Sequence, residues 1–469
     1  MVTIKLNNNK FKVEGDPKVL TKLYKEMAFR HPQAFYIRAS MPKGWDGMVH
    51  MVTDRGYCET GLLPRVIQWI EDHGVPYGID DLRKLPQITA MPVHIGDLKR
   101  RPYQRKAAWS ILKNSCGGVP FPRGIVGAAT NAGKTLIAGL IHASVYQAKT
   151  LVIVNGLELY NQFRDDLPGM FSSWGFMQGK TIQWGDIVVC MLPTLAKNIE
   201  KYWKQLSQYN VLIYDECHLA TSKTARKVLN KLYLIPIRVG LSGTALKHKD
   251  KVKNITVESF FGNETFVIKN KELVEMGVSS NIIITMRKGN TKLFPGADYK
   301  TEFDKSITYG VERMDRAIEA TRYHLREGHK PILVVCKYIP QVEETYERYK
   351  SEFPDLKIEY IHHEVKDRQE KLNRFKRGET DILVASLIIK VGQNMPLIQY
   401  MQNLASGDSA IQALQLLGRA LRSHESKKIT YYDDFFDEGQ YLKRHSKHRL
   451  RYYKDEGLNV IEEFKGKLL

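Results

Sequence analysis

The sequence predicts an α/β protein with two parallel-sheet domains in tandem and a small N-terminal α/β domain before them. Short apolar runs alternate with helical stretches, which is typical of a parallel sheet covered by helices. The alternation occurs twice, first in "LVIVN", "IVVCM" and "VLIYDE" and later in "ILVVC", "ILVAS" and "ITYYD". The 469 residues also allow about three domains of roughly 150 residues each. We therefore predict domains over 1–94, 95–262 and 263–469.

The N-terminal domain begins with a predicted hairpin. Val2, Ile4 and Leu6 alternate with polar residues before three asparagines. Phe11 and Val13 continue the alternation after them. This period of two predicts a pair of strands with one buried face.

A helix and a second pair of strands should follow the hairpin. Asp16 and Pro17 suit the N-cap and the first position of a helix. "AFYIRAS" and "MVHMV" read as strands on either side of a turn at 44–47, and "LLPRVIQWIEDHG" reads as a helix. The stretch 80–98 contains two prolines and little periodicity, so we expect a linker there.

The composition indicates a soluble globular protein with a polyanionic partner. Hydrophobic residues make up 43% of the chain and charged residues 26%, and the net charge is +20. Such a positive field favours nucleic acid. The apolar runs are far shorter than the roughly 20 residues that cross a bilayer, so we expect no membrane segment. The N-terminus lacks an apolar signal region, which predicts a cytoplasmic protein, in a host cell if a phage encodes it. Five scattered cysteines without a CxxC pair argue against a zinc site or disulfides.

The segment 128–138, "AATNAGKTLIA", predicts a phosphate-binding loop between a strand and a helix. A loop at a helix start points backbone amides at an anion, and the helix dipole adds to the attraction. In this interpretation Lys134 reaches the β and γ phosphates of ATP, and the Thr135 hydroxyl binds Mg²⁺. The residues expected to contact ATP are Thr130, Asn131, Ala132, Gly133, Lys134 and Thr135.

The second motif, "LIYDECH" at 212–218, places two acids after an apolar strand. The carboxyl end of such a strand is where a parallel sheet binds its ligands. Asp215 would hold the Mg²⁺, and Glu216 would polarise the attacking water as general base. Two acids in a surface turn fit poorly after four apolar or aromatic residues.

The third feature is "QLLGRALR" at 415–422 in the second parallel-sheet domain. Arg419 and Arg422 are three residues apart, so they would share one face of a helix. Two such arginines alone usually form a solvated face. Together with the upstream loop they read as arginine fingers, which contribute about 10³ to 10⁵ in rate. The complete site would then assemble when the two domains close.

These motifs resemble those of the superfamily 2 helicases and translocases over roughly 95 to 435. The resemblance implies two RecA-like domains. "RPYQ" is similar to the family's adenine-recognition motif, so Gln104 would read the adenine. "SGTA" is similar to the coupling motif, which implies that Ser242 and Thr244 link hydrolysis to domain closure.

The resemblance extends to the fifth and sixth motifs, with two departures. "LVASLIIKVGQNMP" is similar to the fifth motif and would bring Gly392 to the nucleotide. Gln415 matches the sixth motif together with the two arginines. Asn131 replaces the family's loop glycine, which is tolerable because asparagine can adopt left-handed backbone angles. Asn394 replaces a carboxylate near the ribose.

The ends of the chain resemble the UvsW-like bacteriophage helicases. "GWDGMVHMV" and "TGLLPRVIQWIEDHG" are similar to that group's N-terminal accessory module, and "YYDDFFDEGQYLKRHSKHRLRYYKDEG" is similar to its C-terminal end. This resemblance implies a DNA enzyme that remodels branched structures by fork reversal and branch migration. The N-terminal domain would then recognise the DNA structure.

Candidate nucleic-acid contacts are basic residues near aromatic ones, because a translocase grips the phosphate backbone whatever the sequence. In the C-terminal tail and after "SGTA" they are Lys443, Arg444, Lys447, Arg449, Arg451, Lys247 and Lys249. The alternative for each is a solvated face. Trp45 could stack on a base, but a tryptophan beside a turn more often packs a small core.

Other functions stay open at this point. The core motifs would also suit an RNA helicase or an RNA-dependent ATPase. An annealing protein with a degenerate ATP site is a different class, motivated by the two asparagine departures. A restriction-type motor would need a nuclease centre, which the sequence does not show. The sequence indicates neither protein partners nor the oligomeric state.

Overall fold

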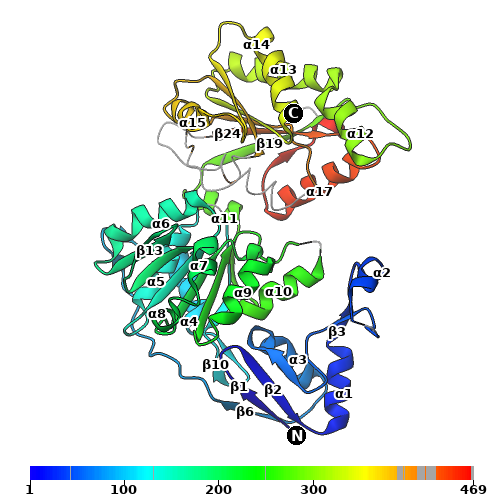
Figure 1. Cartoon of the computed structure of the whole chain (residues 1–469). Coiled ribbons are helices and arrows are strands. Elements are labelled where there is room, and N and C mark those ends of the chain that lie inside the picture. The colour runs from blue at the N-terminus through cyan, green and yellow to red at the C-terminus, as the bar shows by residue number, and fades with distance from the viewer. Residues whose placement is uncertain are drawn as a thin grey trace. The chain divides into compact units, whose positions relative to one another are not determined.

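The computed structural model describes residues 1–42, 44–129, 131–248, 250–387, 395, 397–408, 418 and 429–465. The chain divides into two compact units, Met1–Ala128 with Gly133–Ile268, and Ala129–Ala132 with Lys269–Leu469. Each contains a largely parallel sheet with helices against it, so the predicted fold class is confirmed (Figure 1). None of the described helices is long and apolar enough to cross a membrane.

The N-terminal residues form a four-stranded sheet in the order β5-β2-β1-β6. Its strands are β1 (Val2–Leu6), β2 (Lys10–Gly15), β5 (Tyr57–Glu59) and β6 (Tyr77–Asp81). The predicted hairpin is confirmed, with Leu6 opposite Phe11 and both side chains buried. Helices α1 (Pro17–Glu26) and α3 (Leu63–Asp72) follow as predicted, and Asp16 caps α1 by accepting from the Lys18 amide.

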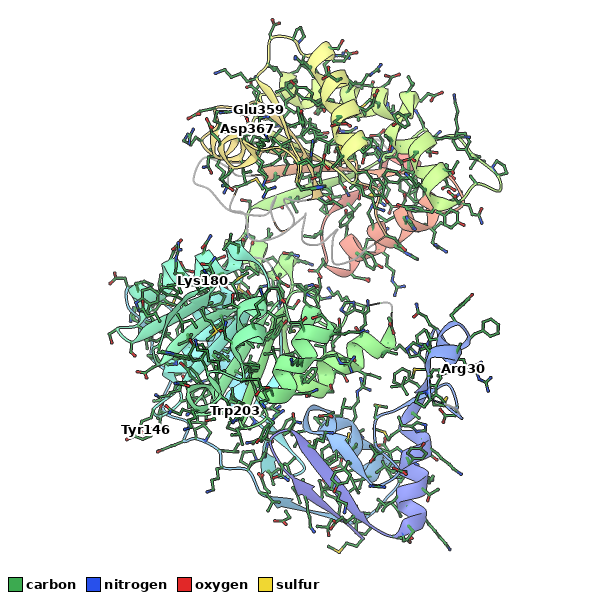
Figure 2. The ribbon with its side chains drawn as sticks, viewed as in Figure 1. Arg30, Tyr146, Lys180, Trp203, Glu359 and Asp367 are labelled. Carbon is green, nitrogen blue, oxygen red and sulfur yellow. The ribbon has the colours of Figure 1, made fainter. Side chains whose placement is uncertain are left out.

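A two-stranded ribbon extends from this sheet, made of β3 (Ala28–Arg30) and β4 (Met48–His50). The predicted strand in "AFYIRAS" is wrong, because α2 (Ala34–Ile37) and the turn η1 (Arg38–Ser40) occupy it. The ribbon ends where Arg30 pairs with Met48, so the residues beyond have no partner strand. Arg30, labelled in Figure 2, is the last residue of β3 and precedes α2 in the sequence.

The N-terminal residues pack against residues of the larger sheet's part of the first unit. Phe121 belongs to their hydrophobic core, and Ile255 packs against it. Arg65 of α3 forms an ion pair with Glu258. The buried Arg123 guanidinium donates to the Asn8 carbonyl. The predicted linker contains a small hairpin, β7 (His94–Ile95) and β8 (Leu98–Lys99), and the division at residue 94 stays a prediction.

The larger sheet of the first unit has eight strands in the order β14-β13-β15-β12-β16-β17-β11-β18. They are β11 (Arg123–Ala128), β12 (Thr150–Val154), β13 (Trp174–Gln178), β14 (Thr181–Gln183), β15 (Ile187–Met191), β16 (Val211–Asp215), β17 (Ile237–Ser242) and β18 (Glu264–Ile268). β14 alone of these runs antiparallel to its neighbour. Because β18 pairs with β11, the domain boundary predicted after residue 262 falls one strand too early.

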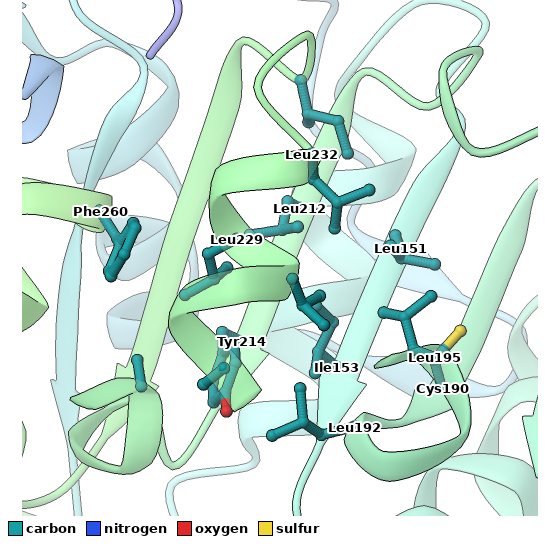
Figure 3. Close-up of a cluster of buried hydrophobic side chains, with 14 of the residues drawn as sticks. Leu151, Ile153, Cys190, Leu192, Leu195, Leu212, Tyr214, Leu229, Leu232 and Phe260 are labelled. Carbon is teal, nitrogen blue, oxygen red and sulfur yellow. The ribbon is translucent and has the colours of Figure 1, made fainter. Parts of the chain in front are cut away.

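Helices and short hairpin strands complete the first unit. They are α4 (Pro102–Leu112), β9 (Ser115–Cys116), β10 (Val119–Pro120), α5 (Lys134–Ala143), α6 (Leu157–Met170), α7 (Leu192–Asn198), α8 (Trp203–Leu206), η3 (Cys217–Thr221), α9 (Lys223–Lys231) and α10 (Lys251–Phe261), with η2 (Thr60–Leu62) before α3. Figure 3 shows side chains of β12, β15 and β16 meeting those of α7 and α9. This dry packing holds the carboxyl ends of the central strands in place.

The second unit contains a seven-stranded parallel sheet in the order β21-β22-β20-β23-β24-β19-β25. The strands are β19 (Asn281–Lys288), β20 (Ile332–Cys336), β21 (Ile358–Ile361), β22 (Ile382–Ser386), β23 (Tyr400–Asn403), β24 (Ile429–Phe436) and β25 (Val460–Ile461). The helical elements are α11 (Asn270–Glu275), α12 (Tyr299–Phe303), η4 (Asp304–Thr308), α13 (Val311–Arg326), α14 (Ile339–Glu352), α15 (Arg368–Lys376), α17 (Leu442–Asp455) and η6 (Glu463–Lys465).

Candidate nucleotide-binding and hydrolysis site

The loop after β11 has the backbone of a phosphate cradle. Asn131 and Gly133 both adopt left-handed angles, each with φ of 72°. When left-handed residues alternate with residues in other conformations, the backbone amides between them point toward the same side of the loop. Helix α5 begins directly after this loop. Asparagine at 131 therefore adopts the conformation that the family's glycine would supply. A Cβ at Gly133 would stand 2.5 Å from Gln104 Nε2, and the left-handed backbone there also favours glycine.

Gln104 lies against this loop from α4. Its side chain is buried, and its Oε1 accepts a hydrogen bond from the Arg101 amide at 2.8 Å. That bond caps the first turn of α4 and orients the side-chain amide toward Gly133. The structure thus brings Gln104 to the loop, while its contact with adenine stays a prediction.

The two acids of the second motif lie where β16 ends, as predicted. Asp215 is 2% exposed, and Glu216 follows in a left-handed conformation with φ of 51°. Lys134 Nζ lies 3.0 Å from Glu216 Oε1 and 4.0 Å from Asp215 Oδ1. The Glu216 amide donates to Asp215 Oδ1 at 2.9 Å. The fold thereby brings the lysine of the loop and both acids into one buried cluster.

The surroundings of Asp215 and Glu216 shift the pKa values of the two acids in opposite directions. Burial raises the pKa of Asp215 to about 6, although Lys134 opposes the shift. Burial also disfavours ionised Glu216, but Lys134 and His218 outweigh it and hold the pKa of Glu216 below its usual range. The pKa of Lys134 is raised because the two carboxylates outweigh its desolvation. Glu216 therefore stays ionised, as an acceptor of a water proton must be.

Ser242, at the end of β17, connects the coupling motif to the general-base candidate. Its hydroxyl donates to Glu216 Oε2 at 3.1 Å and accepts from the Thr244 amide at 3.1 Å. His218 Nδ1 lies 3.0 Å from Ser242 Oγ and 3.3 Å from Glu216 Oε2. Sequence reasoning assigned no role to His218, and its place directly after the two acids was the available signal. The serine and the histidine together orient the Glu216 carboxylate.

Thr135 and Asp215 supply the oxygen ligands that Mg²⁺ prefers. Thr135 lies in the first turn of α5 and is 6% exposed. Its hydroxyl shares a hydrogen bond with Asp166 of α6, whose pKa burial raises despite that bond. Sequence reasoning missed Asp166, which belongs to a helix without a motif. The donors present, amides of a left-handed loop, a lysine, a hydroxyl and a carboxylate, fit a magnesium-bound nucleoside triphosphate.

The candidate nucleic-acid residues have different environments. The side chains of Lys247, Lys443, Arg444, Lys447 and Arg451 are exposed. The prediction for Arg449 is wrong, since its side chain is 2% exposed and donates to Asp434 Oδ2 at 2.9 Å. Arg449 lies on the inner face of α17, because Leu442, His445 and Tyr453 are buried on the same helix. Trp45 is half-buried, and its Nε1 donates to the Met48 carbonyl at 3.0 Å.

Several predicted residues lie outside the part of the chain that the structure describes. These are Thr130 in the loop, Lys249 after the coupling motif, Gly392 and Asn394 in the fifth motif, and Gln415, Arg419 and Arg422 in the sixth. Their roles stay predictions.

Two family models match the chain. The model described as "Type III restriction enzyme, res subunit" matches residues 97–247, and "Helicase conserved C-terminal domain" matches residues 312–424. The ATP-dependent DNA helicase uvsW of Enterobacteria phage T4 is 23% identical over 89% of this chain and 90% of its own length. The putative helicase 22 of Sulfolobus islandicus filamentous virus is 21% identical over 93% of this chain and 80% of its own length.

Solved structures share the fold. A fragment of a putative HsdR subunit of a type I restriction enzyme from Vibrio vulnificus has a TM-score of 0.57 at 16% identity, over 80% of this chain and 70% of that one. The predicted resemblance to superfamily 2 helicases, and to the UvsW-like group among them, is confirmed by these matches together.

We expect Ser242→Ala to lower kcat for ATP hydrolysis about tenfold and to leave KM nearly unchanged. One hydrogen bond to a charged group contributes about 1.5 kcal/mol, which is close to a factor of ten. Steady-state ATPase assays measure both constants. Ser207→Ala is the matched control, because the Ser207 hydroxyl bonds the Lys204 carbonyl on the surface of the same unit. A rise in KM with constant kcat would show that Ser242 acts on nucleotide binding instead.

Proposed function

We propose that this chain is an ATP-dependent helicase of superfamily 2 that acts on branched DNA. It would unwind duplexes, reverse stalled forks and drive branch migration in replication, recombination or repair. The observation that carries the proposal is the extent of the match to the phage T4 helicase, which covers 89% of this chain and so reaches beyond the helicase motifs. We propose that the N-terminal sheet and its ribbon recognise the DNA structure, in the cytoplasm of a host cell.

The residues of the first unit have distinct roles in the proposed hydrolysis. Lys134 and the loop amides bind the phosphates, and Thr135 and Asp215 hold Mg²⁺. The bound metal would neutralise charge that develops on the phosphates. Glu216, the ionised acid, accepts the proton of the attacking water.

The remaining roles concern coupling and closure. Ser242 and Thr244 are bonded to each other through the Thr244 amide, and Ser242 is bonded to Glu216. A movement of this segment therefore changes the orientation of the general base. Arg419 and Arg422 act as the arginine fingers of the closed enzyme, and Gln415 belongs to the same motif. Coupling of hydrolysis to movement then depends on the loop after β17.

The exposed basic residues of α17 and Lys247 suit the phosphate backbone of DNA. Arg444 lies over the Tyr441 ring at 5.8 Å, and Lys443 pairs with Glu438 at 2.7 Å. Each phosphate that a cation neutralises adds about 0.7 to 0.9 to the slope of log affinity against log salt. DNA binding should accordingly weaken steeply as salt rises.

The test compares ATPase and unwinding on single strands, duplex, forks, four-way junctions and RNA at one salt concentration. We expect ATPase stimulation by DNA and the fastest unwinding on forks and four-way junctions. Stimulation by RNA and not by DNA would identify an RNA helicase. No hydrolysis with any polynucleotide would identify a binding or annealing protein. Equal rates on all DNA structures would contradict the preference for branches.

A further inference from the structure

Two neighbouring aromatic side chains are exposed at the end of the β3–β4 ribbon. Phe35 and Tyr36 of α2 are 84% and 83% exposed. Their rings meet edge to face, with centroids 5.6 Å apart. Water is a poor environment for such rings, and large adjacent apolar side chains that stay exposed indicate a binding partner. We name the described residues between the two strands of the ribbon, 31–42 and 44–47, the aromatic tip (Figure 1).

The base of the aromatic tip is packed by ring stacking and hydrogen bonds. The His50 ring stacks on Tyr24 of α1, with centroids 4.0 Å apart and planes 1° apart. His50 Nε2 lies 2.9 Å from Asp46 Oδ2. Trp45 is held by its bond to the Met48 carbonyl. These contacts support the base of the tip, and Trp45 takes part in them. Phe35 and Tyr36 take no part in these contacts.

The charge around the two rings is positive. Arg30 and Arg38 flank α2, and their side chains are exposed. Within the described part of the chain, neither has an ion pair with an acid, whereas Asp46 is engaged by His50. Arginines beside exposed aromatic rings fit a ligand with anionic phosphates and flat faces. Unpaired bases of a nucleic acid have both.

We propose that Phe35 and Tyr36 stack on unpaired bases where the strands of a DNA branch separate, with Arg30 and Arg38 on the adjacent phosphates. This inference rests on the proposed function, because it assumes a branched DNA substrate. An aromatic pair at such a point stabilises the open bases and keeps the duplex from closing. Base stacking on an aromatic side chain contributes about 1–3 kcal/mol per base, so the pair discriminates an opened branch from an intact duplex.

The test uses the full chain and a forked DNA that carries 2-aminopurine at the first unpaired position. We expect wild type to change the 2-aminopurine fluorescence, and Phe35→Ala/Tyr36→Ala to lose this change. We expect the double variant to bind the fork at least about tenfold more weakly, since two stacks are lost. ATPase stimulated by a saturating single strand should stay within about twofold, because the tip is not part of the nucleotide site.

Two further variants keep the result specific. Phe35→Tyr/Tyr36→Phe retains both rings and should restore the fluorescence change. Tyr146→Ala removes another exposed ring of the first unit, 56% exposed and labelled in Figure 2, and should bind like wild type. Wild-type behaviour of Phe35→Ala/Tyr36→Ala would overturn the inference. So would a self-association of wild type that this variant removes, because the tip would then contact a second copy of the chain. If wild type does not bind forked DNA, the proposed function fails first.

Discussion

Glu216→Gln should lower the turnover of ATP by about 100- to 10,000-fold, the usual contribution of a general base. The amide has the size of the carboxylate, so it can still accept from Ser242 and stay in place. It cannot take up a proton from water. Binding of ATP should persist, because Lys134 and the loop amides are unchanged and Lys134 loses the carboxylate that it pairs with at 3.0 Å.

Hydrolysis and binding are measured separately for this prediction. DNA-stimulated phosphate release measures hydrolysis, and a fluorescent ATP analogue measures binding. Glu200→Gln makes the same chemical change at an exposed ion pair with Lys231 and should retain full activity. Lys134→Ala should lose both binding and hydrolysis. Turnover of Glu216→Gln close to the wild-type rate would assign the base to another group.

Arg449→Ala should lower the free energy of unfolding of the second unit by about 3–5 kcal/mol. This is the cost of removing one partner of a buried ion pair. The guanidinium contacts Asp434 through Nε and Nη2 at 2.9 and 3.0 Å, and it donates to the Phe435 carbonyl at 2.8 Å. Without it, Asp434 remains fully buried with its charge compensated only by neutral donors such as the Tyr453 hydroxyl. Burial of an uncompensated carboxylate is what makes the loss large.

The hydrogen-exchange rates of the β24 amides measure the loss of stability in Arg449→Ala, because this strand lies within the sheet of the second unit. Exchange should become faster by a factor of at least about 100 if opening of this unit controls it. Arg451→Ala on the same helix is the matched control, since its side chain is 78% exposed and pairs with Asp455 at 3.6 Å. Surface changes of this kind stay within about 0.5 kcal/mol. Equal exchange rates in the two variants would contradict a structural role for Arg449.

The nucleotide motifs could be predicted because each is local. A glycine-lysine-threonine sequence between a strand and a helix determines the loop conformation and the helix start within a few residues. Two acids that directly follow an apolar strand of a parallel sheet lie at the carboxyl end of that strand. The reason Asn131 is acceptable is also local, since only its backbone angle is used. The composition also predicted a nucleic-acid partner, because the net charge of the chain is positive.

The surface assignments could not be predicted in the same way. Arg449 and Arg451 are two residues apart in one basic helix, yet one is buried and the other exposed. Phe35 and Tyr36 lie in a predicted strand that is instead a short helix, and both side chains are exposed. Periodicity shows which residues share a face, but it does not show which face another element will cover.

By itself, the sequence determined the α/β class, the two parallel-sheet domains and the residues of the phosphate loop and the acid pair, since short-range geometry decides these. Only the tertiary structure decided that Lys134 reaches Glu216 across 82 residues, and that Ser242 and His218 orient that acid. The strand order β16-β17-β11, in which β17 lies between the other two, produces these contacts. Strand order depends on long-range packing of the whole sheet, and no local pattern records it.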